Sequence, residues 1–140
     1  MNDVIINKIQ SIQRCVNRAR EEYGTDVDRF DTDYTRQDAA VLNVLRACEQ
    51  TIDLANHIVR LYKLGIPTSS AESLELLQRK SIIDVTLSRK LKKMVNFRNI
   101  VIHQYQQMDL EIVKSVIISG LDDLVFFSDK ILQFIQRAAK

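Results

Sequence analysis

Apolar residues recur every three or four positions through most of the chain, which is the spacing of one buried face of an α-helix. This pattern predicts long helices at about residues 2–23, 36–64, 85–101 and 109–138, and a short helix at about residues 69–79. The β-branched run at residues 99–102 has no partner strand and is therefore also assigned to a helix. The chain is expected to be all-α, a four-helix bundle with a short additional helix, and to form a single domain over residues 1–140.

Helix-breaking and capping residues mark the ends of these segments. Gly24 and Gly65 are typical C-terminal stops, and Pro67 prevents the second helix from resuming. Thr35 with Asp38 forms a capping pair that predicts the start of the second helix. The remaining starts are expected at Ser69, which forms a capping box with Glu72, and at Asp109.

The second predicted helix carries two apolar stripes. One runs from Val41 to Tyr62 at intervals of four and three, and the other consists of Leu54, Ile58 and Leu61. Such a wide arc is more than a single neighbouring helix needs. This helix and the helix that begins at about residue 85 together present more apolar surface than a single bundle can bury, so we expect a homodimer with twofold symmetry.

Composition narrows the class of protein by exclusion. The 140 residues are 46% hydrophobic and 27% charged, with a formal net charge of +2, which is typical of an ordinary globular protein. No apolar run approaches the roughly 18 residues of a membrane-spanning helix, and residues 1–4 lack the features of a signal peptide. Cys15 and Cys48 have no metal-ligand spacing. We therefore expect a cytoplasmic protein with reduced core cysteines, no membrane contact, no metal and no cofactor.

Charge is unevenly distributed along the chain. Residues 21–38 hold seven acidic and two basic side chains, whereas residues 79–98 hold seven basic and one acidic. A local basic segment can attract a polyanion even when the whole protein is nearly neutral. Lys90, Lys92 and Lys93 are therefore candidate RNA-binding residues, or else simply a solvated helix face.

Candidate catalytic groups lie together in residues 98–105. On an ideal helix Arg98 and His103 are about 140° apart. They converge only if the helix loosens, if Arg98 reaches around it, or if a symmetric copy completes the site. Such a pair supports phosphodiester cleavage in RNA without a metal, because His can move a proton and Arg can stabilise charge on phosphorus. On the residues alone, a structural His beside Arg98 and Tyr105 at a helix end remains the alternative.

A spacing of Arg, four residues, His, one residue and Tyr in a small helical protein resembles the HEPN superfamily. The form that ends in Tyr resembles its HepT-type toxins. The resemblance covers nearly the whole chain and includes the flanking segments 48–57, 64–67 and 91–95.

This resemblance implies a HEPN-like domain with metal-independent endoribonuclease activity on tRNA or mRNA. It implies Arg98 and His103 as the catalytic pair, Asn99 as a polar neighbour, and a dimer in which the two motifs face each other. It also implies an MntA-like nucleotidyltransferase antitoxin that transfers AMP from ATP to Tyr105. Each AMP adds negative charge and bulk at the mouth of a site that receives RNA phosphate.

Two further questions stay open at this point. Glu49, Asp53 and His57 share one face of the second helix, where they form either an ion-pair ladder or, as the resemblance suggests for Glu49 and Asp53, supporting polar groups of the cleft. The same motif residues also suit a non-catalytic HEPN module that binds a partner nucleotidyltransferase or a nucleotide. A plain helical interaction protein without a site is the third possibility.

Overall fold

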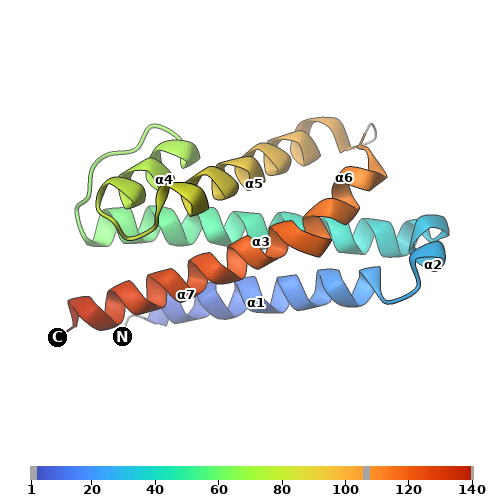
Figure 1. Ribbon diagram of the computed structural model, residues 1–140, viewed down its shortest axis with the longest axis horizontal. Coiled ribbons are helices and arrows are strands. Elements are labelled where there is room, and N and C mark those ends of the chain that lie inside the picture. The colour runs from blue at the N-terminus through green and yellow to red at the C-terminus, as the bar shows by residue number, and fades with distance from the viewer. Residues whose placement is uncertain (1–2, 106–107, 140) are drawn as a thin grey trace.

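Helices account for nearly all of the backbone, as the spacing of apolar side chains predicts. The computed structural model describes residues 3–105 and 108–139, and within those residues there is no β-strand. The long helices are α1 (Asp3–Tyr23), α3 (Tyr34–Leu61), α5 (Val85–Gln104) and α7 (Leu121–Ala138). The shorter ones are α2 (Val27–Thr32), α4 (Ser70–Arg79) and α6 (Leu110–Ser115), and a π-helical turn, η2 (Val116–Gly120), joins α6 to α7 (Figure 1). The prediction of an all-α four-helix bundle with a short additional helix is confirmed.

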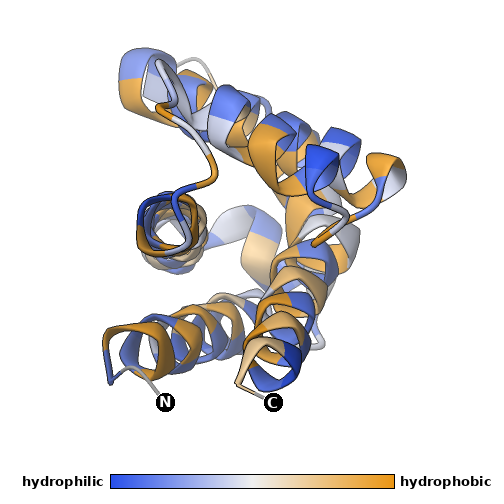
Figure 2. Cartoon of the chain, turned by 90° about the vertical axis from the view of Figure 1, so that its left-hand side faces the viewer, coloured by the Kyte–Doolittle hydropathy of each residue, from blue (hydrophilic) through white to orange (hydrophobic). Residues whose placement is uncertain are grey.

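Helix α3 is central, and this explains its wide apolar arc. It packs against α1, α4, α5 and α7. Leu54 and Ile58 of the second stripe are completely buried in this chain, and of that stripe only Leu61 is exposed. The prediction that this stripe requires a second copy of the chain is therefore wrong, because the neighbouring helices already cover it. Figure 2, which looks along the bundle, shows helices that each combine hydrophobic and hydrophilic faces.

The beginning and end of α3 differ from the prediction. Asp33 is the N-cap, and its side chain accepts a hydrogen bond from the Arg36 backbone N–H. The prediction that Asp38 helps to cap this helix is therefore wrong. The helix ends at Leu61 instead of residue 64, and Lys63 then adopts a left-handed conformation with φ of 54°. The acidic connection before α3 contains the short helix α2, which Asp26 caps and which the periodicity did not predict.

Two of the predicted helix starts are confirmed. The Ser69 hydroxyl accepts a hydrogen bond from the Glu72 backbone N–H at the start of α4. The Asp109 side chain caps the last helical segment in the same way, by accepting from the backbone N–H of Glu111. These caps satisfy N–H groups that have no partner inside the helix.

The last predicted helix is interrupted by the π-helical turn η2. Gly120 ends this turn, and a Cβ atom there would lie 2.9 Å from the sulfur of Met94 on α5. The absence of a side chain at Gly120 therefore lets η2 approach α5 closely. The β-branched run at residues 99–102 lies inside α5, as predicted.

Both cysteines are buried and free, as predicted. Burial, reinforced by the charge of neighbouring Glu49, raises the pKa of the Cys48 thiol to about 12. No helix in the described part of the chain has the length and apolar character needed to cross a membrane.

Candidate active site

Arg98 is held between three helices. From α5 its Nη1 atom lies 3.3 Å from Oε1 of Glu49 on α3, and its Nη2 atom donates to the Ser70 hydroxyl at the start of α4, also at 3.3 Å. The Nε atom of Arg98 is buried and has no hydrogen-bond partner among the described residues. The guanidinium group is thus fixed on two sides, and its terminal nitrogens, which carry two N–H groups each, keep donor capacity for a further acceptor such as a phosphate oxygen.

His103 lies on the other side of the same helix. α5 continues without interruption to Gln104, so the helix does not loosen between the two residues, and they stay about 140° apart around its axis. His103 and Asn99 are exposed, and neither has a polar side-chain contact within residues 3–105 and 108–139. One copy of the chain therefore presents Arg98 and His103 on separate faces of α5.

Tyr105 follows the end of α5 and turns back toward α3. Its hydroxyl donates a hydrogen bond to Oδ1 of Asp38. Partial burial, together with the hydrogen bond to Asp38 and the negative charge of that carboxylate, raises the pKa of Tyr105 to about 12. Sequence analysis missed this role of Asp38, because its position near a helix start was read as a capping signal.

A groove of about 430 Å³ runs between α3 and α5 beside this contact. Asp38 and Tyr105 contribute its polar groups, and the rest of its lining is apolar. These apolar residues are Val41, Leu42, Leu45, Val101 and Ile102.

Glu49 and Asp53, the two candidate acidic residues of α3, contact different partners. Glu49 reaches Arg98, as described above, whereas Asp53 lies 3.7 Å from Nζ of Lys8 on α1. His57 lies beyond Asp53 on the same face, and burial together with the charges of Arg60 and Lys8 lowers its pKa. The structure thus brings Glu49 to the motif, and it directs Asp53 toward α1.

The three candidate RNA-binding lysines of α5 differ in their surroundings. Lys92 forms an ion pair with Glu75 of α4, and its hydrogen bond and charge lower the pKa of that carboxyl. Lys90 lies 3.9 Å from Asp123 of α7. Lys93 is exposed, forms no ion pair in the described part of the chain, and lines a groove of about 720 Å³ between α5 and η2. Of the three, Lys93 has the charge that is most available to a phosphate.

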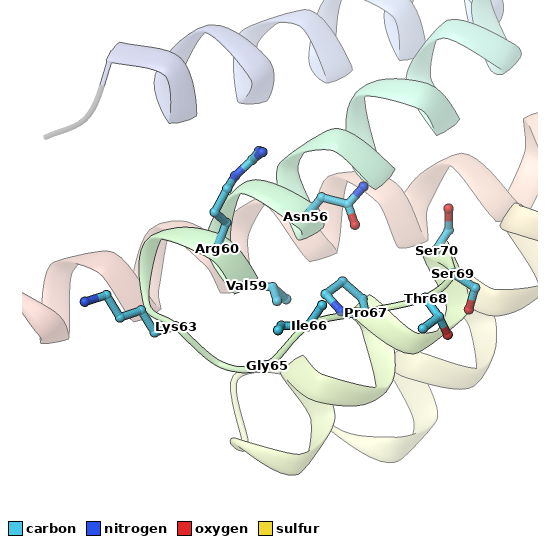
Figure 3. Close-up of a pocket in the computed structure, with 10 residues that line it drawn as sticks. All are labelled: Asn56, Val59, Arg60, Lys63, Gly65, Ile66, Pro67, Thr68, Ser69 and Ser70. Carbon is cyan, nitrogen blue, oxygen red and sulfur yellow. The ribbon is translucent and has the colours of Figure 1, made fainter.

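A larger groove of about 740 Å³ adjoins Arg98 through Ser70. Figure 3 shows the side chains of Thr68, Ser69 and Ser70 at one end, Lys63 at the other, and apolar residues between them. The segment 64–67 had signalled only a family resemblance, so sequence analysis found neither Ser70 nor this groove.

The described residues do not include a candidate metal site. No group of three or more His, Cys, Asp or Glu side chains suited to a metal ion occurs within residues 3–105 and 108–139. The chemical groups that the structure does offer are a fixed guanidinium, an exposed imidazole and a hydrogen-bonded phenol.

Comparison with known proteins gives consistent matches along almost the whole chain. Residues 12–131 match the family model described as ribonuclease HepT-like. The chain is 49% identical over 131 residues to the mRNA nuclease HepT of Shewanella oneidensis, covering 94% of this chain and 98% of that protein.

Solved structures agree with this result. The tri-AMPylated Shewanella oneidensis HEPN toxin in complex with MNT antitoxin is 48% identical, with a TM-score of 0.89, over 95% of this chain and 99% of that chain. A toxin–antitoxin structure with AMP-PNP is 47% identical, also with a TM-score of 0.89, over 94% of this chain and 99% of that chain. The cytosolic protein YutE of Bacillus subtilis shares the fold, with a TM-score of 0.83 at 16% identity over 96% of this chain and 90% of that chain.

Proposed function

This chain belongs to the HepT-like ribonuclease family, and we propose that it is the toxin of a toxin–antitoxin pair, a metal-independent endoribonuclease that an MntA-like nucleotidyltransferase silences by transferring AMP to Tyr105. The observation that carries this proposal is the family match over residues 12–131, which spans the whole Arg98–Tyr105 motif. Messenger RNA is the substrate class that the name of the relative supports, and tRNA is the other class that the family resemblance implies. We propose that the protein acts in the cytoplasm, where it meets its RNA substrate. Residues 1–140 are proposed to form one HEPN-like domain.

In the proposed reaction, Arg98 and His103 have different tasks. His103 exchanges a proton with the attacking 2′-hydroxyl or with the leaving oxygen of the RNA. Arg98 stabilises the negative charge that grows on phosphorus, and its contacts with Glu49 and Ser70 hold the guanidinium group in place for this. Attack by the 2′-hydroxyl leaves a 2′,3′-cyclic phosphate on the product, and Asn99 supplies a further polar contact beside His103.

We infer a homodimer because one copy separates the two catalytic groups. Ile102 lies between Arg98 and His103 around the axis of α5, Ile100 lies on the far side of His103, and they are 52% and 44% exposed. A twofold contact through this surface buries both residues and brings His103 of one copy toward Arg98 of the other. Of the two helices whose apolar surface predicted a dimer, α5 is therefore the one with exposed apolar residues that support it.

The proposed control of this activity is electrostatic and steric. AMP on Tyr105 places a negatively charged, bulky group two residues from His103. It repels RNA phosphate and also blocks access to the site. The solved relatives, an AMPylated HEPN toxin with its MNT antitoxin and a toxin–antitoxin pair with AMP-PNP, support this assignment.

The catalytic assignment is tested by RNA cleavage in the presence of EDTA. Arg98→Ala and His103→Ala should each abolish cleavage and toxicity while the chain stays folded by circular dichroism. Arg98→Lys should also be poor, because Lys lacks the bidentate guanidinium fork. Cleavage that depends on a metal, or a fully active His103→Ala chain, would contradict the assignment. A wild-type chain that binds nucleotide or the antitoxin but never cleaves RNA would favour the non-catalytic module.

The role of Tyr105 is tested with an antitoxin that binds but cannot transfer AMP. Tyr105→Phe should keep cleavage activity and escape the active antitoxin, and its intact mass should show no AMP increments. If the inactive antitoxin restores growth equally well against wild type and Tyr105→Phe, inhibition is by binding alone and the role given to Tyr105 is wrong.

A further inference from the structure

One hydrogen bond joins the end of α5 to the second turn of α3. Tyr105 donates it to Asp38, and the two residues lie 67 positions apart in the sequence. Asp38 takes part in no ion pair within residues 3–105 and 108–139, so no Lys or Arg neutralises its charge there. Asp38 also does not cap α3, because Asp33 is the N-cap of that helix. The Tyr105 hydroxyl is thus the one side-chain partner that the described structure gives to this carboxylate.

The surroundings of this hydrogen bond are largely apolar. Asp38 and Tyr105 sit at a groove of about 430 Å³ whose other lining residues are Val41, Leu42, Leu45, Val101 and Ile102. An apolar lining lowers the local dielectric and strengthens a hydrogen bond to a charged acceptor. Yet the residue remains 42% exposed, so the side chain of Tyr105 is open to contact with a partner enzyme.

Because Tyr105 is protonated at neutral pH, AMP transfer to its hydroxyl requires a base. Burial and the nearby carboxylate raise its pKa to about 12, so the hydroxyl keeps its proton at neutral pH. A neutral phenol is a weak nucleophile and needs an adjacent base that removes the proton as the new bond forms. The same contact that keeps the proton on Tyr105 also provides an acceptor for it.

We propose that Asp38 is the base that receives the Tyr105 proton when AMP is transferred to this hydroxyl, so that the toxin supplies a catalytic group for its own inactivation. The inference rests on the proposed function of Tyr105 as the AMP acceptor. It assigns the nucleotide site to the antitoxin and activation of the acceptor to this chain. Tyr105 is selected as acceptor because it has the carboxylate beside its hydroxyl.

The bonds and charges in this step balance with ATP as the co-substrate. The Tyr105 oxygen forms a bond to the α-phosphorus of ATP, and the bond from that phosphorus to the bridging β-phosphate oxygen breaks. Pyrophosphate leaves with the electron pair of that bond. The phenolic proton moves to Asp38 and then to water, which returns the carboxylate to its charged form.

The test measures how fast AMP is added to the chain of residues 1–140. Saturating antitoxin and ATP with Mg²⁺ are mixed with wild type, Asp38→Asn, Asp38→Glu or Asp28→Asn, and the intact mass of the toxin is followed with time. Asn keeps an oxygen that can accept the hydrogen bond from Tyr105 but cannot take the proton, whereas Glu keeps the carboxylate. Asp28→Asn, on α2, is the matched control because it removes one charge from the same acidic segment without contacting Tyr105.

Asp38→Asn should slow AMP addition about 10²-fold, which is typical of losing a general base, and Asp38→Glu should recover much of the rate. Asp28→Asn should match wild type. RNA cleavage by unmodified Asp38→Asn should be unchanged, which shows that the variant is folded.

Three results would overturn the inference. If Asp38→Asn is modified at the wild-type rate, Asp38 is at most a hydrogen-bond acceptor. If Asp28→Asn is slowed as much as Asp38→Asn, the effect is one of overall charge at the docking surface. If the wild-type chain gains no AMP at all, the proposed role of Tyr105 fails and this inference fails with it.

Discussion

The hydroxyl of Tyr105 should ionise only at unusually high pH, because partial burial and the hydrogen bond to Asp38 both raise its pKa. The difference in phenolate absorbance between wild type and Tyr105→Phe should give a pKa of about 12 for Tyr105. Asp38→Asn should lower that pKa, although burial should still keep it above its ordinary value. A value near 10, the ordinary value for Tyr, in the wild-type chain would contradict the contact.

The same shift predicts how stability depends on pH. The folded state holds the Tyr105 proton more tightly than the unfolded state, so this contribution to stability is complete below about pH 10. It is lost as pH rises through the folded pKa of about 12. Unfolding by urea at several pH values should show a smaller loss over this range in Tyr105→Phe than in wild type.

Glu49 and Asp53 give a matched pair of carboxylates on one helix. Only Glu49 contacts Arg98, whereas Asp53 pairs with Lys8. Glu49→Gln should lower the rate of RNA cleavage about tenfold, because a loosened guanidinium is less well placed on the phosphate. The free energy of unfolding should change by less than about 1 kcal/mol, since the ion pair is partly exposed. Equal cleavage rates for Glu49→Gln and Asp53→Asn would show that this contact does not position Arg98.

Among the elements, α5 carries both the motif and the basic segment, and its lysines are not equivalent. Lys92 and Lys90 have acidic partners, whereas Lys93 has none in the described part of the chain. Lys93→Ala should therefore reduce the dependence of RNA affinity on salt concentration more than Lys92→Ala does. Fluorescence anisotropy with catalytically inactive His103→Ala chains measures this directly. If both lysine variants keep the slope and affinity of the His103→Ala chain, these lysines form only a solvated face.

Much of the fold could be predicted from local signals. The spacing of apolar residues and the caps Ser69 and Asp109 correctly placed the long helices and the short helix α4. The capping residue of α3 was predicted wrongly, because several acidic residues near the start of the helix could cap it. Only the three-dimensional structure shows that Asp33 does so. The π-helical turn depends on the close approach of Gly120 to Met94, which no sequence periodicity records.

Prediction of the site was limited in a similar way. The spacing from Arg98 to Tyr105 can be read along one helix, but the partners Glu49, Ser70 and Asp38 lie on other helices. Glu49 was proposed from family resemblance. Ser70 and the contact of Asp38 with Tyr105 required the packing of α4 and α3 against α5.

The proposed active site requires two copies of the chain, because one copy presents Arg98 and His103 on separate faces of α5. Ile100→Lys should break the dimer because it places a charge within the proposed interface, whereas Val85→Lys at the other end of α5 should not. Both residues are exposed in the single chain, at 44% and 53%, so neither change should prevent folding. Sedimentation velocity at micromolar concentration distinguishes a dimer from a monomer. A monomeric wild-type chain that still cleaves RNA would contradict the shared site.

We propose above all that this chain is a ribonuclease whose activity is abolished by AMP on Tyr105. The most direct measurement is the rate of RNA cleavage by one purified preparation before and after AMP transfer, with EDTA added after the transfer has finished and the antitoxin removed. The unmodified chain should cleave RNA, the modified chain should not, and Tyr105→Phe treated in the same way should stay active. A fully modified chain that cleaves RNA at the unmodified rate would contradict the account.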